Sequence, residues 1–311
     1  MNVSSLFDGG SVGRFSLIQA GIEVDNYFSS EIEKHAIDNT AINFPDVQQL
    51  GDVTKWREWE LPKIDILIGG SPCQGFSRQG GGLNFNHPQS KLFFEYVDIL
   101  KHLKQQNPDL KFMLENVDMK KEWEEVITDY LGVEPIKINS GLLVPQNRPR
   151  TYWTNFEVKQ PEYNGNKLTD IIQDVELEDY EVIGGIKVCN SFSDASKDLI
   201  SLGRDGIRVA QPVKKGYAIA EPGDGINISF PTSKTRRGRV IKGRSSCLDT
   251  SCDIGVYDLN GQIRRFTRNE MERLQGLPDG FTSSLNDSQA KSLLGNGWTA
   301  DVVTHIFKQL K

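Results

Sequence analysis

The 311-residue sequence is poor in cysteine, in long apolar runs and in net positive charge. Its four cysteines, Cys73, Cys189, Cys247 and Cys252, are too few for the disulfide framework of a small secreted protein. Cys247 and Cys252 also lack the spacing, the second pair and the nearby histidine of a zinc site, so we expect no bound metal. This composition suits a protein of a reducing compartment.

No apolar run reaches the length of about 18 residues that a membrane-spanning helix needs, so we expect no membrane association. The first five residues lead directly into a predicted strand, without the basic region or cleavage site of an export signal. The formal net charge of −6 argues against a generally basic nucleic-acid binder. It leaves open a local binding surface, because the distribution of charge decides such contacts.

One strongly basic segment stands out against this acidic background. Residues 234–244 contain six cations and no acid in eleven positions, among them Arg236, Arg237 and Arg239. A solvated charged loop is the plain alternative for such a run. Beside the catalytic motifs described below, contact with nucleic-acid phosphates is the favoured interpretation.

The first 155 residues alternate short apolar runs with helical patterns, which predicts a parallel sheet built from βαβ units. After about residue 156 glycine and proline become frequent and helical periodicity is poor, except around residues 193–202. Helical patterns return at the C-terminal end. We therefore expect an α/β domain over 1–155, a small, mostly β and loop domain over 156–261, and a helical segment over 262–311. The predicted strands are 3–7, 26–30, 47–52 and 64–68, and the predicted helices are 14–20, 92–104, 117–131, 268–274 and 299–310.

The most informative motif is Gly69-Gly70-Ser71-Pro72-Cys73-Gln74. It places Cys73 just beyond an apolar strand, at the sheet edge where open α/β folds hold their chemistry. A free cysteine is more often a small buried apolar residue than a nucleophile. Two further motifs favour the nucleophile, because Glu115-Asn116-Val117 and Gln146-Asn147-Arg148-Pro149-Arg150 also follow candidate strands. Thiol, carboxyl and guanidinium groups are thus expected in one crevice.

These motifs, in this order, resemble those of the DNA (cytosine-5-)-methyltransferase family, bacterial and phage type. The likeness extends to Leu6-Phe7-Asp8-Gly9-Gly10, to Arg268–Pro278 and to Leu294–Trp298, and covers about residues 1–155 and 262–311. Two positions depart from the family pattern. The first loop lacks the commoner Phe-x-Gly-x-Gly-Gly spacing, and Trp298 stands where a smaller residue is more usual.

The resemblance implies a Rossmann-like α/β fold that uses S-adenosylmethionine. It also implies that residues 262–311 return to the catalytic domain over 1–155, and that residues 156–261 are a target-recognition domain. From the residues themselves, Gly9 and Gly10 would let the backbone approach a ligand closely. Glu31 would accept hydrogen bonds from ribose hydroxyls, and Asp52 one from the adenine amino group. The alternative for each carboxylate is a plain turn cap. The resemblance completes the predicted cofactor-binding set, which besides Gly9, Gly10, Glu31 and Asp52 contains Phe7, Asp8, Ile32, Val53, Pro72, Leu92, Asn296 and Trp298.

The implied reaction methylates carbon 5 of cytosine within a specific double-stranded DNA sequence. Cys73 would add to carbon 6 of the ring, and Glu115 would offset charge that develops on it. Arg150 would hold the carbonyl oxygen of the base, and Arg148 would position Glu115 or a phosphate. Because carbon 6 is hidden in the duplex, the base must be flipped out. The loop 75–91 would clamp the DNA through Ser77, Arg78 and Gln79.

Two other readings remain open at this stage. The same chemistry could act on tRNA, or the chain could be a catalytically silent DNA-binding subunit. The glutamine after Cys73 and the sizeable variable domain favour DNA, and the complete set of catalytic residues favours an enzyme. We expect a monomer in the cytoplasm of a bacterial or phage-infected cell, at the nucleoid. The recognition sequence and the role in restriction, phage self-protection or regulation stay open.

Overall fold

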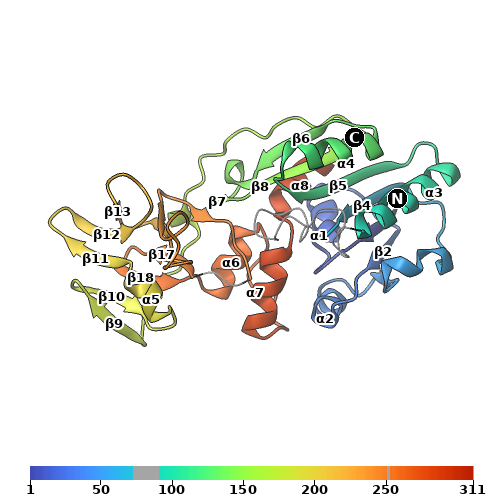
Figure 1. The fold of residues 1–311 in the computed structure, drawn as a ribbon. Coiled ribbons are helices and arrows are strands. Elements are labelled where there is room, and N and C mark those ends of the chain that lie inside the picture. The colour runs from blue at the N-terminus through green and yellow to red at the C-terminus, as the bar shows by residue number, and fades with distance from the viewer. Residues whose placement is uncertain (73–90, 251–252, 311) are drawn as a thin grey trace. The chain divides into compact units, whose positions relative to one another are not determined.

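The computed structural model describes residues 1–72, 91–250 and 253–310. These residues form two compact units (Figure 1). Unit 1 consists of Met1–Asn139, Pro149–Pro161 and Gly297–Lys311, and unit 2 of Ser140–Arg148 and Glu162–Asn296. Residues 262–296 thus pack in unit 2, although the sequence motifs assign them to the catalytic domain. The functional boundary at 156–261 stays a prediction, because spatial packing alone does not say which residues take part in catalysis.

A seven-stranded sheet in the order β3-β2-β1-β4-β5-β8-β6 forms the centre of unit 1. The strands from β3 to β5 are parallel, and β8 runs antiparallel to both β5 and β6. A sheet of this kind needs helices on both faces, and the chain supplies them between the strands. The elements are β1 (Asn2–Leu6), α1 (Val12–Gln19), β2 (Asn26–Ser30), α2 (Lys34–Asn43), β3 (Gln48–Gln49), η1 (Val53–Glu58), β4 (Ile66–Gly70), α3 (Leu92–Gln106), β5 (Lys111–Val117), α4 (Lys121–Leu131), β6 (Pro135–Asn139), β8 (Pro149–Thr154) and α8 (Ala300–Phe307).

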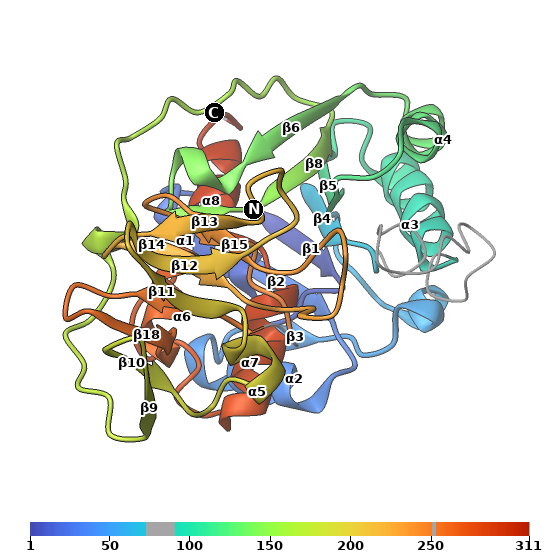
Figure 2. The same ribbon diagram turned by 60° about the vertical axis from the view of Figure 1, so that its left-hand side comes forward.

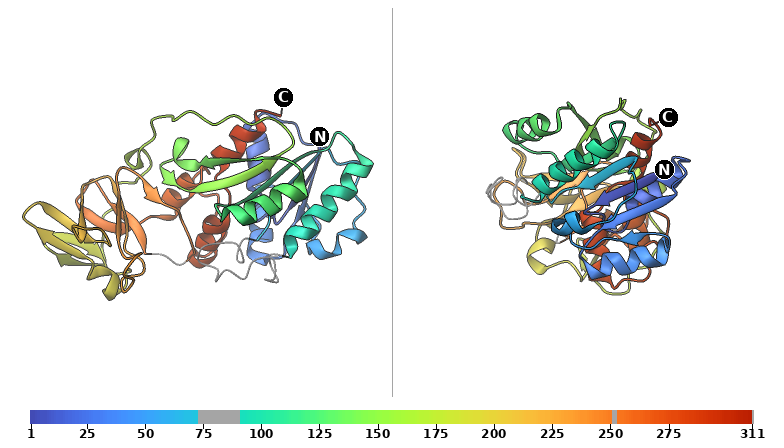
Figure 3. Two further views of the ribbon diagram at one scale, coloured as in Figure 1. Left: turned by 45° about the horizontal axis from the view of Figure 1, so that its top comes forward. Right: turned by 90° about the vertical axis from the view of Figure 1, so that its right-hand side faces the viewer.

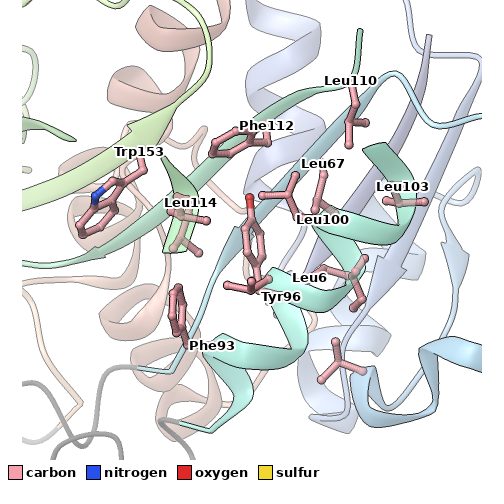
Figure 4. Close-up of a cluster of buried hydrophobic side chains, with 14 of the residues drawn as sticks. Leu6, Leu67, Phe93, Tyr96, Leu100, Leu103, Leu110, Phe112, Leu114 and Trp153 are labelled. Atoms are coloured by element: carbon pink, nitrogen blue, oxygen red, sulfur yellow. The ribbon is translucent and has the colours of Figure 1, made fainter. Parts of the chain in front are cut away.

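Helices α3 and α4 cover one face of this sheet (Figure 3). The apolar stripe of α3, which includes Phe93, Tyr96 and Leu100, is buried against side chains of the central strands (Figure 4). Leu67 on β4 and Phe112 on β5 are fully buried in the same cluster. The i, i+3, i+4 spacing in α3 produces this stripe, so the predicted helix over 92–104 is confirmed.

Helices α1 and α8 pack together, and the Ser16 hydroxyl of α1 donates a hydrogen bond to the Ala300 carbonyl at 3.2 Å. The start of α8 therefore lies beside α1, although nearly the whole chain separates them in sequence. Gly21 ends the first helical segment with a φ of 70°, a left-handed conformation that glycine adopts without strain.

Unit 2 is mostly β-structure (Figure 2). A six-stranded sheet has the order β15-β14-β17-β18-β10-β9, and a three-stranded meander has the order β11-β12-β13. The elements are η3 (Ser140–Leu142), β7 (Gln146–Asn147), η4 (Leu168–Asp170), β9 (Tyr180–Ile183), β10 (Ile186–Cys189), α5 (Asp194–Lys197), β11 (Ile200–Gly203), β12 (Gly206–Ala210), β13 (Tyr217–Ala220), β14 (Asp224–Asn227), β15 (Arg239–Ile241), β16 (Ser245–Ser246), β17 (Ile254–Tyr257), β18 (Gln262–Arg265), α6 (Arg268–Leu274) and α7 (Asp287–Asn296).

The helical pattern around 193–202 was a wrong prediction. Only the four-residue helix α5 forms there, and the segment continues as strand β11. Strand β11 pairs along its length with β12, so sheet hydrogen bonds override a weak helical preference. The pattern analysis also missed α7, which buries only Ala290, Leu293 and Leu294.

Candidate active site

The loop between β1 and α1 has an unusual backbone. Phe7, Gly9 and Ser11 have φ angles of 57°, 59° and 57°, and two of these three residues are not glycine. Left-handed conformations cost free energy in residues with a β-carbon and concentrate at functional sites. A β-carbon placed on Gly9 would meet no atom within 4 Å, so space is open beside this residue.

Asp8 holds this loop from the inside. Its buried carboxylate accepts hydrogen bonds from the hydroxyls of Ser5 and Ser11, both at 2.5 Å, and of Tyr27 at 2.7 Å. Burial raises the pKa of Asp8, while the hydroxyl donors partly lower it. Asp8 thus fixes the shape of the predicted cofactor loop through its side chain. The sequence offered no signal for this hydroxyl cluster, because Ser5 and Tyr27 belong to different strands.

Glu31 follows the next strand and is held in one orientation. Its Oε2 accepts a hydrogen bond from the Gly9 amide at 2.8 Å, and its Oε1 accepts bonds from the amides of Ile32 and Glu33 at 2.7 and 2.9 Å. The carboxylate therefore stands at the carboxyl edge of the sheet, against the glycine loop. Beside it, the Ile32 side chain is 69% exposed.

The structure describes four further predicted cofactor residues of unit 1, Asp52, Val53, Pro72 and Leu92, and one of unit 2, Asn296. Oδ1 of Asp52 accepts two hydrogen bonds from Thr54, which lower the pKa of Asp52 and cap η1. Val53 is buried, and Leu92 is partly buried against the main core cluster. Pro72 is half-buried and is the last described residue of its loop. Asn296 is an exposed residue at the end of α7 in unit 2.

The predicted acid motif and arginine motif meet in unit 1. Oε1 of Glu115 lies 3.1 Å from Nε of Arg150, because β5 and β8 are paired strands of the central sheet. Oε2 of Glu115 accepts a hydrogen bond from the indole nitrogen of Trp298 at 3.0 Å. On the other side of β5, Gly70 is the register partner of Glu115. Gly70 precedes Cys73 by three positions in the sequence.

The start of the cysteine loop is tied to the acid motif. The side-chain amide of Asn116 donates to the Ser71 carbonyl at 3.2 Å and to the Ser71 hydroxyl at 3.1 Å. Cys73 itself, and the predicted DNA-contacting residues Ser77, Arg78 and Gln79, lie outside the described residues. The first residue of this loop is therefore bonded to the residue that follows Glu115.

Three hydrogen-bond partners of Arg148 lie within unit 2. Its guanidinium donates to the carbonyls of Leu248 and Gly295, both at 3.0 Å, and to the sulfur of Cys247 at 3.1 Å. The side chain is buried. The structure therefore brings Arg150 to Glu115, and it gives Arg148 a set of bonds that connects β7 with the end of α7.

The basic run 234–244 belongs to unit 2 and comprises the residues before β15, that strand and the residues that lead to β16. Arg236 and Arg239 are exposed and Arg237 is half-buried. The guanidinium of Arg236 lies 4.5 Å from the ring centre of Phe230, a residue that is 38% exposed and has a φ of 57°. An exposed aromatic ring in a strained conformation beside a cation is a feature that the sequence pattern did not single out.

Two features are absent from the part of the chain that the structure describes, a cluster of metal ligands and a membrane-spanning helix. No group of three or more metal-ligating side chains occurs within residues 1–72, 91–250 and 253–310. None of the helices described there is both long and apolar enough to cross a membrane.

Comparison with known proteins identifies the family. The sequence profile of the family described as "C-5 cytosine-specific DNA methylase" matches residues 1–128 and 139–311. The chain belongs to this family. It is 28% identical over 305 residues to the type II methyltransferase M1.ScrFI of Lactococcus lactis subsp. cremoris, which covers 93% of this chain and 72% of that protein. It is also 28% identical over 327 residues to M.NlaX of Neisseria lactamica, with 99% and 96% covered.

The fold is also similar to that of a solved methyltransferase structure. The solved structure of a methyltransferase of Entamoeba histolytica, EhMeth, superposes with a TM-score of 0.65 at 21% identity and covers 100% of this chain and 99% of that one. The Rossmann-like methyltransferase fold is therefore confirmed. As a family member, the protein is a DNA cytosine-5 methyltransferase, and its fold is that of enzymes that use S-adenosylmethionine.

Proposed function

We propose that this protein methylates cytosine at carbon 5 within one short double-stranded DNA sequence, by way of a covalent bond from Cys73. The supporting observation is the register of β4 and β5, which puts Gly70 beside Glu115 three residues before the cysteine. A nucleophile on this turn and a carboxyl on the next strand suit addition to a ring whose charge must be offset. The type II relatives favour a restriction-modification role.

The described loop after β1 fits S-adenosylmethionine. The open space at Gly9 lets a ligand approach the backbone closely. The oriented carboxylate of Glu31 can accept hydrogen bonds from ribose hydroxyls, and the exposed Ile32 offers an apolar contact. A nucleoside needs all three. Phe7, Asp52, Val53, Pro72, Leu92, Asn296 and Trp298 complete the proposed set, with Asp8 and Gly10 shaping the loop. When bound, the cofactor supplies an electrophilic methyl group.

The protein's own residues would carry out the other parts of the reaction. The thiolate of Cys73 forms a bond to carbon 6, which makes carbon 5 of the ring a nucleophile. Glu115 hydrogen-bonds the ring and offsets its charge, while Arg150 holds both Glu115 and the base. After methylation, loss of the carbon 5 proton to solvent expels the thiolate and restores the aromatic ring.

The target base must leave the helix for this chemistry. We propose that the loop 75–91 clamps the DNA from which the base is flipped, through Ser77, Arg78 and Gln79. We assign Arg236, Arg237 and Arg239 of unit 2 to DNA phosphates. Residues 156–261 would read the sequence, and the enzyme would act as a monomer in the cytoplasm.

The decisive experiment is trapping on duplex DNA that carries 5-fluorocytosine at the target. Fluorine cannot leave as a cation, so elimination stalls and a covalent adduct accumulates. Cys73→Ser should abolish both the adduct and methylation. Cys189→Ser is the matched control, because Cys189 is a half-buried free thiol of unit 2 and should be dispensable. Methylation by the Cys73→Ser variant at an appreciable rate would refute the covalent mechanism.

Bisulfite sequencing of DNA from cells that express the protein supplies the target sequence. A parallel assay on tRNA separates the polymers. Methylation of tRNA without methylation of DNA would overturn the proposed substrate.

A further inference from the structure

The two oxygens of Glu115 are held by two different donors. Arg150 Nε lies 3.1 Å from Oε1, and Trp298 Nε1 donates to Oε2 at 3.0 Å. The side chain of Glu115 is only 11% exposed. A carboxyl that is bound at both oxygens cannot rotate freely about its terminal bond, so its plane is set by residues from two other parts of the chain.

Two glycines make room for the indole of Trp298. A β-carbon on Gly70 would lie 2.7 Å from the indole nitrogen and 3.1 Å from Oε2 of Glu115. A β-carbon on Gly13 would lie 3.3 Å from the far edge of the same ring. Real β-carbons essentially never approach within 3.0 Å of another atom, so the slot at Gly70 requires glycine. The backbone on both sides is thus built around this tryptophan.

We propose that Trp298 is a positioning residue for Glu115. It locks the carboxyl plane and, as a donor to the ionised form, lowers the pH at which Glu115 takes up a proton. This inference rests on the proposed role of Glu115 in methyl transfer. It adds to the expectation that Trp298 lines the cofactor site, because a residue against both α1 and Glu115 connects the cofactor loop with the acid.

Other titratable groups lie close to this slot. Arg150 is the charged partner of Glu115 on β8. On the opposite edge of the indole, a β-carbon on Gly13 would lie 2.8 Å from the Tyr27 hydroxyl, which donates to Asp8. A test of the Trp298 bond must therefore separate the titration of Glu115 from that of Asp8.

The first test is Trp298→Phe, which keeps an aromatic ring and removes the N–H donor. We expect the single-turnover methylation rate at saturating cofactor to fall about tenfold. This factor corresponds to the lower end of the free energy of a hydrogen bond to a charged group. The pH midpoint of that rate should move upward by about one unit. Trp56→Phe is the matched control, because Trp56 Nε1 also donates to a carboxylate, that of Glu95, at 3.0 Å in unit 1. It should change neither quantity.

Two results would overturn the proposal. One is an unchanged rate and pH midpoint in Trp298→Phe. The other is a rate loss that disappears at saturating cofactor, which would make Trp298 a residue of the cofactor pocket alone.

A second measurement does not depend on activity. The second measurement is the NMR signal of the Trp298 indole N–H in ¹⁵N-labelled protein. The wild type has five tryptophans, and the indole signal that is missing in Trp298→Phe belongs to Trp298. That signal should shift with pH in the wild type, and it should be insensitive to pH in Glu115→Gln but still shift in Asp8→Asn. A signal that titrates identically in Glu115→Gln refutes the bond to Glu115. Inactivity of the wild-type protein on DNA would instead refute the proposed function.

Discussion

At the scale of single residues, the surroundings of each carboxylate decide what it does. Asp8 and Asp52 both follow strands of the same sheet, and both were predicted to bind the cofactor. Asp8 is buried among hydroxyls and its pKa is raised, whereas Asp52 is exposed, bonded to Thr54, and its pKa is lowered. Two aspartates in similar sequence positions thus make opposite electrostatic contributions to folding.

These opposite shifts predict opposite pH effects on stability. Because the pKa of folded Asp8 lies above its ordinary value of 3.8, its contribution is complete at low pH and declines as pH rises through the raised pKa. The unfolding free energy of the wild type relative to Asp8→Asn should therefore fall as the pH rises above 3.8. For Asp52→Asn, the same difference should increase as pH rises from below 3.8. Urea denaturation across this pH range measures both, and a difference that does not change with pH for Asp8 would contradict the argument.

At the scale of elements, the junction of β18 and α6 is held by one glutamate. Glu270 accepts two hydrogen bonds from the Arg264 guanidinium, both at 2.9 Å, and it also accepts one from the Thr267 amide in a capping box. Arg264 also donates to Asp258 at 2.9 Å. The three charged side chains are nearly inaccessible to water, so each depends on the others.

Glu270→Gln should therefore destabilise the protein strongly. Glutamine retains the capping geometry but leaves the buried Arg264 with one charged partner, and breaking a buried ion pair costs about 3–5 kcal/mol. The control is Asp279→Asn, which breaks the partly exposed pair of Asp279 with Arg273 on the same helix and should cost less than about 1 kcal/mol. Chemical denaturation of both variants provides the comparison. Equal losses would show that burial is not the cause.

At the scale of the whole molecule, the predicted chemistry and the predicted DNA contact belong to different units. Glu115 and Arg150 lie in unit 1, and the basic run 234–244 lies in unit 2. The net charge of −6 means that attraction to DNA has to come from such a local segment. Removing its charge should weaken DNA binding without affecting the cofactor.

Replacing Arg236, Arg237 and Arg239 together by alanine should reduce the salt dependence of DNA binding. Each lost phosphate contact removes roughly 0.9 from the slope of log affinity against log salt, so three contacts remove up to about 2.7. A matched variant with Lys34, Lys120 and Lys121 replaced by alanine loses the same charge from exposed positions of unit 1. Its slope should stay close to that of the wild type. Equal slopes in all three proteins would make the basic run an ordinary solvated loop.

The sequence by itself determined the local elements and the reaction class. Apolar runs followed by glycine turns predicted β1 and β4, and the i, i+3, i+4 stripe predicted α3, because these signals depend on neighbours within a few residues. The linear order of the motifs around Cys73 and Glu115 identified the chemistry, and the family comparison confirms it.

Only the tertiary structure decided which side chains meet. Arg148 and Arg150 are two positions apart in the sequence, yet one bonds to carbonyls of unit 2 and the other to Glu115. Trp298 reaches Glu115 across 183 positions, through a slot that a β-carbon on Gly70 would close. Such contacts depend on strand register and on the packing of distant segments, and no pattern of adjacent residues encodes either.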